Sequence, residues 1–252
     1  MKRVIGSLVA FAFLAGAVPV AVDAADEKEA LKIMAKMDDI NTNYDDQEFV
    51  MTMKLYSGKK LDKTIELKTQ EKGGEKRLIR ILKPGDVKGL SVLVEDADTM
   101  YVYMPQFKRT RRVAAHTNKQ SFLGSDFTEQ EMAIIRYDEK FNPSMIEKTD
   151  KETLLRLIPK DEKEFEFKYI KMWIDNETHF ANKLEYYGAD DFKLKTQTRS
   201  GVTKINGILT QTKVVMEDHR KKHSTEMIIT DVKENQGLSD RLFTRRNLEW
   251  GR

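Results

Sequence analysis

Short runs in which apolar and polar residues alternate are the feature of this 252-residue sequence that most constrains its fold. In the clearest run, Phe49, Met51, Met53 and Leu55 occupy every second position. Similar spacing recurs at residues 64–68, 165–173, 184–186, 192–194, 214–216 and 227–229. A period of two places successive side chains on opposite faces of a strand, so each run predicts a β-strand with one apolar face.

Turn-forming residues separate these runs, as they do between the strands of a meander. They lie at Ser57-Gly58, Gly73-Gly74, residues 83–86, residues 188–190 and Asn206-Gly207. We count about eleven strands. Helical spacing and capping residues predict only a few short helices, near residues 26–37, 128–136 and 239–243. No linker, repeat or low-complexity tract divides the chain, so we expect one mainly β domain over residues 25–252.

A sheet with one apolar face must bury that face, and a barrel or half-barrel with helices on its concave side does so. Many of the 12 methionines of the chain lie on these apolar faces. Methionine is unbranched and polarizable, so the faces fit either an ordinary core or a cavity that accepts flexible chains. For a ligand cavity, the predicted lining residues are Phe49, Met51, Met53, Leu55, Ile65, Leu67, Met100, Met172, Trp173, Met216 and Met227.

The first 24 residues have the pattern of a secretory signal peptide. Lys2 and Arg3 precede an uncharged stretch over residues 4–22, and Val22 and Ala24 occupy the −3 and −1 positions of a cleavage site. A membrane anchor is the alternative, because the stretch approaches the length of a membrane-spanning helix. A proline inside the stretch and the small residues at the cleavage site favour cleavage, so we predict an exported protein.

The formal charges of the chain nearly cancel, with 44 Lys and Arg against 41 Asp and Glu and a net charge of +3. This balance argues against a nucleic-acid-binding protein, whose surface is usually strongly basic. Cysteine is absent, which excludes disulfides, thiolate metal sites, cysteine nucleophiles and a lipidated N-terminal cysteine. An exported chain of this size needs no disulfide to hold its core, so we predict a diffusing protein of the periplasm of a Gram-negative bacterium.

The motifs of common catalytic sites are missing. The sequence contains no G-x-S-x-G, G-x-x-x-x-G-K or H-E-x-x-H motif. His219 and His223 have a metal-binding spacing only if they lie on a helix, and their segment is typical of a polar turn between strands. Ser125 and Asp126 fit a turn in which Asp126 accepts backbone amides ahead of a helix at Thr128 better than they fit a hydrolase site. We therefore predict no enzymatic activity, no metal and no cofactor.

The strongest charge cluster of the sequence follows a strand-like run that ends at Pro105. Four of its five side chains are basic: Lys108, Arg109, Arg111 and Arg112. Such a patch can contact anionic lipid headgroups or an acidic partner. It can also be a charged edge strand that resists edge-to-edge aggregation of the sheet. Both interpretations stay open at the level of sequence.

Five segments, taken in their order, resemble the outer-membrane lipoprotein-sorting protein family, the LolA-like group. They are KPGDVKG at residues 83–89, MYVYMP at 100–105, RTRR at 109–112, FLGSDFT at 122–128 and LSDRLFT at 238–244. The resemblance covers nearly all of the chain after the signal peptide and is clearest over residues 83–132. It implies a LolA/LolB-like fold, an unclosed antiparallel β-barrel wrapped around helices, with an apolar concave cavity.

The same resemblance implies a periplasmic carrier that shields a lipid, an acylated lipoprotein or another hydrophobic ligand on its way toward the outer membrane. The resemblance also implies an association with lipid exporters of the resistance-nodulation-division (RND) type, which many relatives of this subgroup accompany. The expected partners are therefore an inner-membrane transporter, an outer-membrane acceptor and, transiently, the membrane itself. The alternative is a periplasmic adaptor or envelope-stress sensor that uses the same fold for protein contacts.

Overall fold

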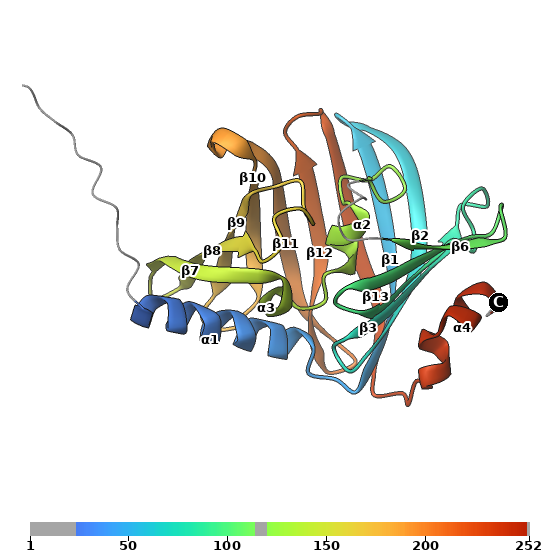
Figure 1. The fold of residues 1–252 in the computed structure, drawn as a ribbon, viewed down its shortest axis with the longest axis horizontal. Helices are drawn as coiled ribbons and strands as arrows, with labels where there is room; N and C mark the ends of the chain where they lie inside the picture. Colours follow the sequence, from blue (N-terminus) through green and yellow to red (C-terminus); the bar gives the residue numbers. More distant parts are fainter. Residues whose placement is uncertain (1–23, 114–119, 251–252) are drawn as a thin grey trace, which may run out of the picture.

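The computed structural model describes residues 24–113 and 120–250, so the predicted signal peptide lies outside the described residues apart from Ala24. The chain folds into one large, strongly curved sheet with helices on both sides of it (Figure 1). In chain order the elements are α1 (Ala24–Asn41), β1 (Asp46–Ser57), β2 (Lys60–Lys72), β3 (Lys76–Lys83), β4 (Ser91–Asp96), β5 (Thr99–Met104), β6 (Arg109–Val113), α2 (Glu129–Ala133), α3 (Tyr137–Lys140), β7 (Phe141–Lys148), β8 (Glu152–Pro159), β9 (Tyr169–Asp175), β10 (Ala181–Tyr187), the 3-10 helix η1 (Ala189–Asp191), β11 (Lys193–Ile205), β12 (Ile208–Asp218), β13 (His223–Glu234), the 3-10 helix η2 (Asp240–Phe243) and α4 (Arg245–Trp250).

The strands of the described residues form a single antiparallel sheet in the order β6-β5-β4-β3-β2-β1-β13-β12-β11-β10-β9-β8-β7. The first and last strands therefore pair at the centre of the sheet, with Met51 opposite Ile229 and Met53 opposite Met227. Strands β6 and β7, from the middle of the chain, are the two edges, and within the described part of the chain they are not paired with each other. The predicted unclosed barrel is confirmed.

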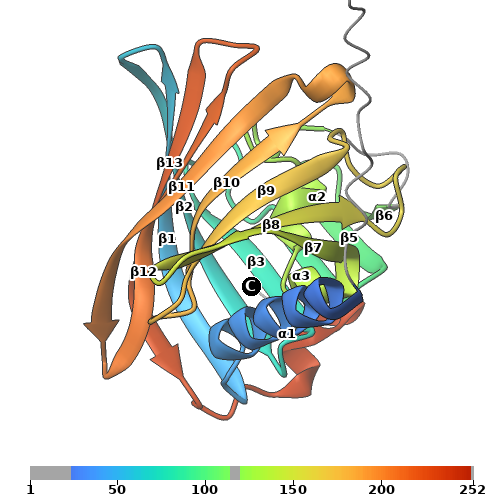
Figure 2. The same cartoon turned by 90° about the vertical axis from the view of Figure 1, so that its left-hand side faces the viewer.

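Helices occupy the concave side and the opening of this half-barrel. Figure 2 shows α1 across the open side next to β7, with α2 and α3 inside the curve of the sheet. The helical spacing predicted for residues 26–37 is confirmed, because Ala30, Met34 and Met37 are fully buried along one face of α1. Helix α2 begins with the predicted capping box, in which Thr128 accepts the backbone N–H of Glu131 and the Glu131 side chain accepts that of Thr128.

The core of the protein lies on the concave face, where the two-residue periodicity directs the apolar side chains of the strands. A row of aromatic rings extends this core. The ring centroids of Phe141 and Phe165 are 5.2 Å apart, and those of Phe165 and Phe167 are 4.9 Å apart. The sequence predicted a strand from residue 165, but β9 begins only at Tyr169. Phe165 and Phe167 are buried from a loop instead, because their rings fold inward onto the core.

The outer face of the sheet carries a second, smaller apolar cluster. The structure has thirteen strands where about eleven were predicted, and part of the difference arises because this cluster interrupts the alternation of apolar and polar residues. Leu78 of β3 and Leu93 of β4 point outward and are covered by Phe243 of η2 and Leu248 of α4. Strand β3 is therefore apolar on both faces and lacks a clear alternation. Figure 1 shows α4 outside the sheet, at the C-terminal end of the chain.

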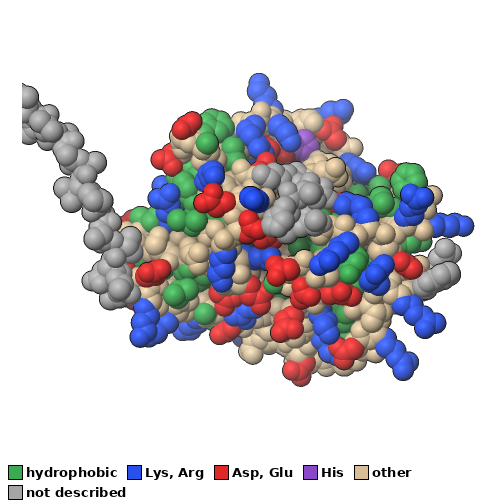
Figure 3. All heavy atoms as spheres, viewed as in Figure 1, with side chains coloured by type: hydrophobic (Ala, Val, Ile, Leu, Met, Phe, Trp, Pro, Cys, Tyr) green, Lys and Arg blue, Asp and Glu red, His purple; other side chains and the backbone are tan. Residues whose placement is uncertain are grey.

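The surface carries charges of both signs together with some exposed apolar side chains (Figure 3). Acidic and basic side chains are interspersed on the face shown in Figure 3, in keeping with the small net charge. Among the described helices, none combines the length and the apolar character that a membrane span requires. The polar turn predicted around His219 and His223 is confirmed, since β12 ends at Asp218 and β13 begins at His223.

Candidate functional site

A cavity of about 280 Å³ lies on the concave face of the sheet. Its walls come from the C-terminal end of α1, the segment 131–137 that contains the end of α2, strands β1 to β3, and strands β11 to β13. This volume is close to the lower end of the range of small-molecule sites, about 300–1,000 Å³. Two apolar side chains at the cavity are partly exposed, Ile40 of α1 at 38% and Leu209 of β12 at 43%.

One part of the cavity wall is apolar and flexible. It is lined by Phe49, Met51, Ile79, Phe127, Met132, Val214, Met227 and Ile229. Met51 and Met227 lie on the adjacent central strands β1 and β13. Unbranched thioether side chains can adjust to an irregular apolar surface, so this part of the cavity suits a hydrocarbon chain.

Three of the eleven side chains predicted to line a ligand cavity do line this one: Phe49, Met51 and Met227. Seven others belong to the same apolar core but lie away from the cavity: Met53, Leu55, Ile65, Leu67, Met100, Met172 and Met216. Contact of these seven side chains with a ligand stays a prediction.

Trp173 lies on the other face of the sheet. Its neighbour Met172 is fully buried in the concave core, and consecutive residues of a strand point to opposite faces. The Lys183 ammonium lies 4.4 Å from the centroid of the Trp173 ring, a cation–π contact on the outer face of β9 and β10. The sequence pattern predicted Met172 and Trp173 together in the cavity, a placement that strand geometry does not allow.

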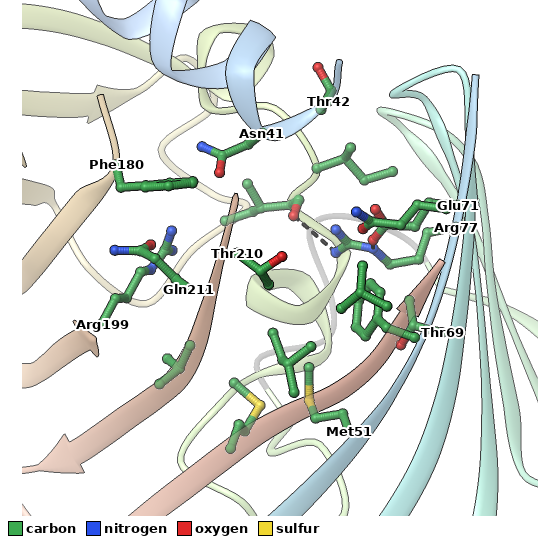
Figure 4. Close-up of a pocket in the computed structure, with 18 of the residues that line it drawn as sticks. Asn41, Thr42, Met51, Thr69, Glu71, Arg77, Phe180, Arg199, Thr210 and Gln211 are labelled. Atoms are coloured by element: carbon green, nitrogen blue, oxygen red, sulfur yellow. Dashed lines mark hydrogen bonds and ion pairs between the residues drawn. The ribbon is translucent and has the colours of Figure 1, made fainter. Parts of the chain in front are cut away.

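A buried ion pair forms one polar wall of the cavity. Arg77 Nε donates to Glu71 Oε1 at 2.6 Å, and Arg77 Nη1 donates to the carbonyl oxygens of Met132 at 2.7 Å and Ile134 at 3.0 Å. The hydroxyl of Tyr44 donates to the second oxygen of Glu71, and burial raises the pKa of Tyr44. Figure 4 shows Glu71 and Arg77 side by side on this wall. The pair is neutral overall and ties the segment after α2 to strand β3.

A second buried ion pair holds the start of α2 to the sheet. Lys195 of β11 lies 3.1 Å from Glu131 Oε1 and 2.6 Å from Glu166 Oε1. The side chains of Lys195 and Glu131 are each only 3% exposed. Burial raises the pKa of Glu131, and the ammonium of Lys195 opposes that rise. Helix α2 is thus fixed to β11 by two opposite buried charges. Removing either charge would leave the other buried without a partner, which is strongly destabilising.

Arg199, four residues further along β11, projects into the cavity opposite the Glu71–Arg77 pair (Figure 4). Its Nη2 donates to the hydroxyl of Tyr137 at 2.7 Å and to Gln197 Oε1 at 3.3 Å. The guanidinium carbon lies 5.7 Å from the centre of the Tyr137 ring. Its Nε is buried and has no hydrogen-bond partner among the described residues.

These polar side chains on β11 were not predicted, because polar positions of a strand are usually assigned to solvent. Lys195 and Gln197 are buried on the concave face, whereas Phe192, which was expected to begin this strand, is exposed. The signal was present in the sequence, since neither set of alternate positions after Leu194 is apolar. A strand in the middle of a sheet with one buried face must then bury polar groups, and those groups need partners.

The basic cluster lies at the edge of the sheet, in and just before β6. Arg111 is bound to the carboxylate of Glu129 in α2, with Nη2 at 2.8 and 3.0 Å from the two oxygens. Arg112 donates to Thr99 at 3.4 Å, whereas Lys108 and Arg109 are exposed at the turn between β5 and β6. The position fits a charged edge strand, and contact with a headgroup or partner stays a prediction.

Asp126 has a different role from the one that the sequence suggested. Its carboxylate contacts His223 Nδ1 at 2.7 and 2.8 Å and accepts the hydroxyl of Thr225 at 2.7 Å. The expected bonds to backbone amides are absent from the described residues because the loop turns its carboxylate toward β13. The loop 121–128 is thereby joined to the central strand of the sheet.

Several solved structures have an architecture similar to this one. A family model described as "Uncharacterized protein" matches residues 73–250. A solved DUF1329 family protein from Desulfovibrio piger is 26% identical with a TM-score of 0.79, over 88% of this chain and 99% of that chain. No curated protein matches the sequence.

Two further solved structures share the fold. A domain from Vibrio parahaemolyticus, described as an outer membrane lipoprotein-sorting protein domain, is 23% identical with a TM-score of 0.78, over 88% of this chain and 99% of that chain. A LolA superfamily protein from Nitrosomonas europaea is 20% identical with a TM-score of 0.72, over 86% of this chain and 98% of that chain. The chain therefore belongs to the family whose model covers residues 73–250, and its unclosed barrel has the fold of the LolA superfamily.

Proposed function

We propose that this protein is a periplasmic carrier that shields the hydrocarbon part of a lipid or lipid-modified ligand in its concave cavity. The observation that carries the proposal is the cavity itself, with flexible apolar side chains on β1 and β13 and partly exposed Ile40 and Leu209 beside it. Each methylene moved from water into such a site contributes about 0.8 kcal/mol, so an enclosed acyl chain would bind without any covalent step.

The cellular setting of the proposal has separate support. The signal-peptide pattern of residues 1–24 supports export, and the shared fold of the lipoprotein-sorting domain supports a role in carrying. We include in the proposal uptake from an inner-membrane exporter of the RND type and delivery to an outer-membrane acceptor. The cargo is either an acylated lipoprotein or a free lipid.

A charge placed in the apolar part of the cavity is expected to abolish ligand binding. Met51→Glu puts a carboxylate in the cavity, whereas Thr52→Glu puts the same group on the opposite face of β1. We expect the first variant to lose at least about tenfold in bound lipid, because a carboxylate among hydrocarbon is strongly unfavourable. Native mass spectrometry of protein purified from the periplasm, followed by solvent extraction, measures the lipid in each variant.

The wild-type protein should carry a stoichiometric acyl-bearing or polyisoprenoid adduct, and Thr52→Glu should keep it. Protein that is free of lipid as isolated is then mixed with vesicles that contain a fluorescent phospholipid. A wild-type protein that neither carries nor extracts any lipid would contradict the carrier proposal, as would equal lipid content in both variants.

A second function, contact with a protein partner, is favoured by one specific observation. Phe107 is 66% exposed at the β5–β6 turn, directly before the exposed Lys108 and Arg109. An exposed aromatic ring beside two exposed cations is a feature of interaction surfaces. The adaptor function would use this turn without needing the cavity.

Reversing the charge of Lys108 and Arg109 tests that function. The double variant Lys108→Glu, Arg109→Glu is expected to weaken capture of an acidic partner at least about tenfold and to leave bound lipid unchanged. Arg111 is left intact because it holds Glu129. Lys59→Glu, at the exposed β1–β2 turn, is the matched control. Cross-linking in the periplasm measures the complex, and equal cross-linking in all three proteins would exclude this surface.

A further inference from the structure

We propose that the ligand of this cavity is an anionic amphiphile whose acid group is bound by Arg199, with its hydrocarbon chain along Met51 and Met227. This inference rests on the carrier function proposed above and narrows its ligand to one chemical class, a carboxylate or phosphate attached to a long apolar chain. Three features support it: the lack of a carboxylate partner at Arg199, the free Nε donor of Arg199 and the position of Met51 across the cavity from Arg199 (Figure 4).

The other charged groups of the cavity have partners within the protein. Glu71 is paired with Arg77, and Glu131 is paired with Lys195. The two further carboxylates of the lining are also engaged: Asp38 accepts the backbone N–H of Asp138 at 2.8 Å, and Glu234 accepts Gln47 Nε2 at 3.0 Å.

Arg199 differs from these groups. Its hydrogen bonds go to the neutral oxygens of Tyr137 and Gln197, and no carboxylate lies within 4 Å of it among the residues that the structure describes. Arginine stays charged at any physiological pH, so among the described residues the guanidinium of Arg199 is a positive charge with no carboxylate paired directly to it. An anion bound next to Arg199 would supply the counter-charge that this guanidinium lacks.

The free donor of Arg199 gives this anion a place to bind. Nε is buried without a partner among the described residues, and an unmade hydrogen bond at a buried donor is unfavourable. Nη2 donates to Tyr137 and Gln197, which fixes the plane of the guanidinium, and a ligand oxygen would reach Nε once the side chains that cover this atom move aside. Oxygens of a carboxylate or phosphate match the donors of a guanidinium in geometry and charge.

Arg199 and the methionine Met51 lie on different sides of the cavity (Figure 4). Figure 4 shows Gln211 and Phe180 next to Arg199, and Met51 at some distance on the far strand. A ligand with one acid group and one hydrocarbon chain would place the acid group at Arg199 and the chain along Met51. An uncharged lipid would leave the Arg199 charge and its Nε unsatisfied, so the site should discriminate against it.

The experiment compares acids with uncharged analogues that have the same chains. Displacement of Nile red, an uncharged dye, gives the Kd of hexadecanoate against hexadecan-1-ol, and of dipalmitoyl phosphatidate against dipalmitoylglycerol. The wild-type protein should bind at least one acid about 10- to 100-fold more tightly than its analogue. The pair that shows the preference distinguishes a carboxylate ligand from a phosphate ligand.

Arg199→Gln is expected to remove this preference, with the Kd of the uncharged analogue unchanged, and Arg199→Lys should keep part of it. Arg156→Gln, an exposed arginine on the outer face of β8, is the matched control and should behave as wild type. Circular dichroism melting verifies that each variant is folded. If Arg199→Gln does not fold, the acid-to-analogue ratios of the wild type and Arg199→Lys decide.

The two proposals can fail separately. Equal affinity of the wild-type protein for acids and uncharged analogues would overturn the anionic ligand and leave the carrier function standing. The anionic ligand is also overturned if Arg199→Gln weakens both members of a pair equally, since Arg199 would then only support the cavity wall. Absence of binding for all four compounds would overturn this inference, whereas the carrier function is decided by the lipid that the purified protein carries or extracts from vesicles.

Discussion

Replacing Lys195 by alanine is expected to lower the free energy of unfolding by about 3–5 kcal/mol, the usual effect of removing one partner of a buried ion pair. The ammonium of Lys195 contacts both Glu131 and Glu166, and two of the three side chains are almost fully buried. Without it, Glu131 must stay charged in an apolar medium or take up a proton. Urea denaturation followed by circular dichroism measures the change.

Two further variants separate the charge effect from other effects of the substitution. Lys193→Ala removes a half-exposed lysine of the same strand, paired with Glu185 at 3.2 Å, and should change stability by about 1 kcal/mol or less. The double variant Lys195→Met, Glu131→Gln removes the buried charge of both partners and keeps an oxygen for the cap at Thr128. It should recover most of the lost stability. A Lys195→Ala protein as stable as Lys193→Ala would contradict this account.

Asp38→Asn is expected to make the protein more stable at pH 8 than the wild type, by up to about 4 kcal/mol. Burial at the end of α1 raises the pKa of Asp38 to about 7 from 3.8, although the backbone N–H of Asp138 opposes the rise. Between these two values the folded state binds more protons than the unfolded state. The stabilisation that comes from this group is therefore complete at low pH and is lost as the pH rises through 7.

An asparagine cannot ionise, and its carbonyl oxygen can still accept the N–H of Asp138. The free energy of unfolding of the variant should consequently fall less than that of the wild type between pH 4 and pH 8. Asp39→Asn, at an exposed neighbouring position paired with Arg136, is the control and should retain the wild-type slope. Parallel pH profiles for Asp38→Asn and the wild type would show that Asp38 is ionised in the folded protein throughout this range.

The sequence predicts most of the sheet because the period of two follows directly from strand geometry. Residues 49–55 show this, with four buried side chains on one face. The prediction fails where a second layer covers the outer face, as at Leu78, or where an edge strand tolerates polar residues and a proline, as in β7 at Asn142 and Pro143. In both cases the alternation is interrupted by contacts that the local sequence does not contain.

The cavity could be predicted only in part, for a related reason. Apolar lining residues such as Met51 follow from the alternation. Arg199 and Lys195 do not, because their burial depends on partners more than 60 residues away, Tyr137 and Glu131. The strand order that brings β11 beside α2 is a property of the whole chain. A search of single runs for apolar faces therefore finds the hydrocarbon side of the cavity and misses its charged side.

The pairing of β1 with β13 also has a consequence for how the protein is made. Gln47 and Glu234, which are hydrogen-bonded across this pair, are 187 residues apart in the chain. A chain that is synthesised from its N-terminus exposes one edge of β1, with its apolar face, until β13 has been made. Such an edge is a template for aggregation, and its late pairing is a slow, non-local step. Pairing of β1 with β13 should therefore be a late step of folding, and chains that lack β13 should aggregate through the β1 edge.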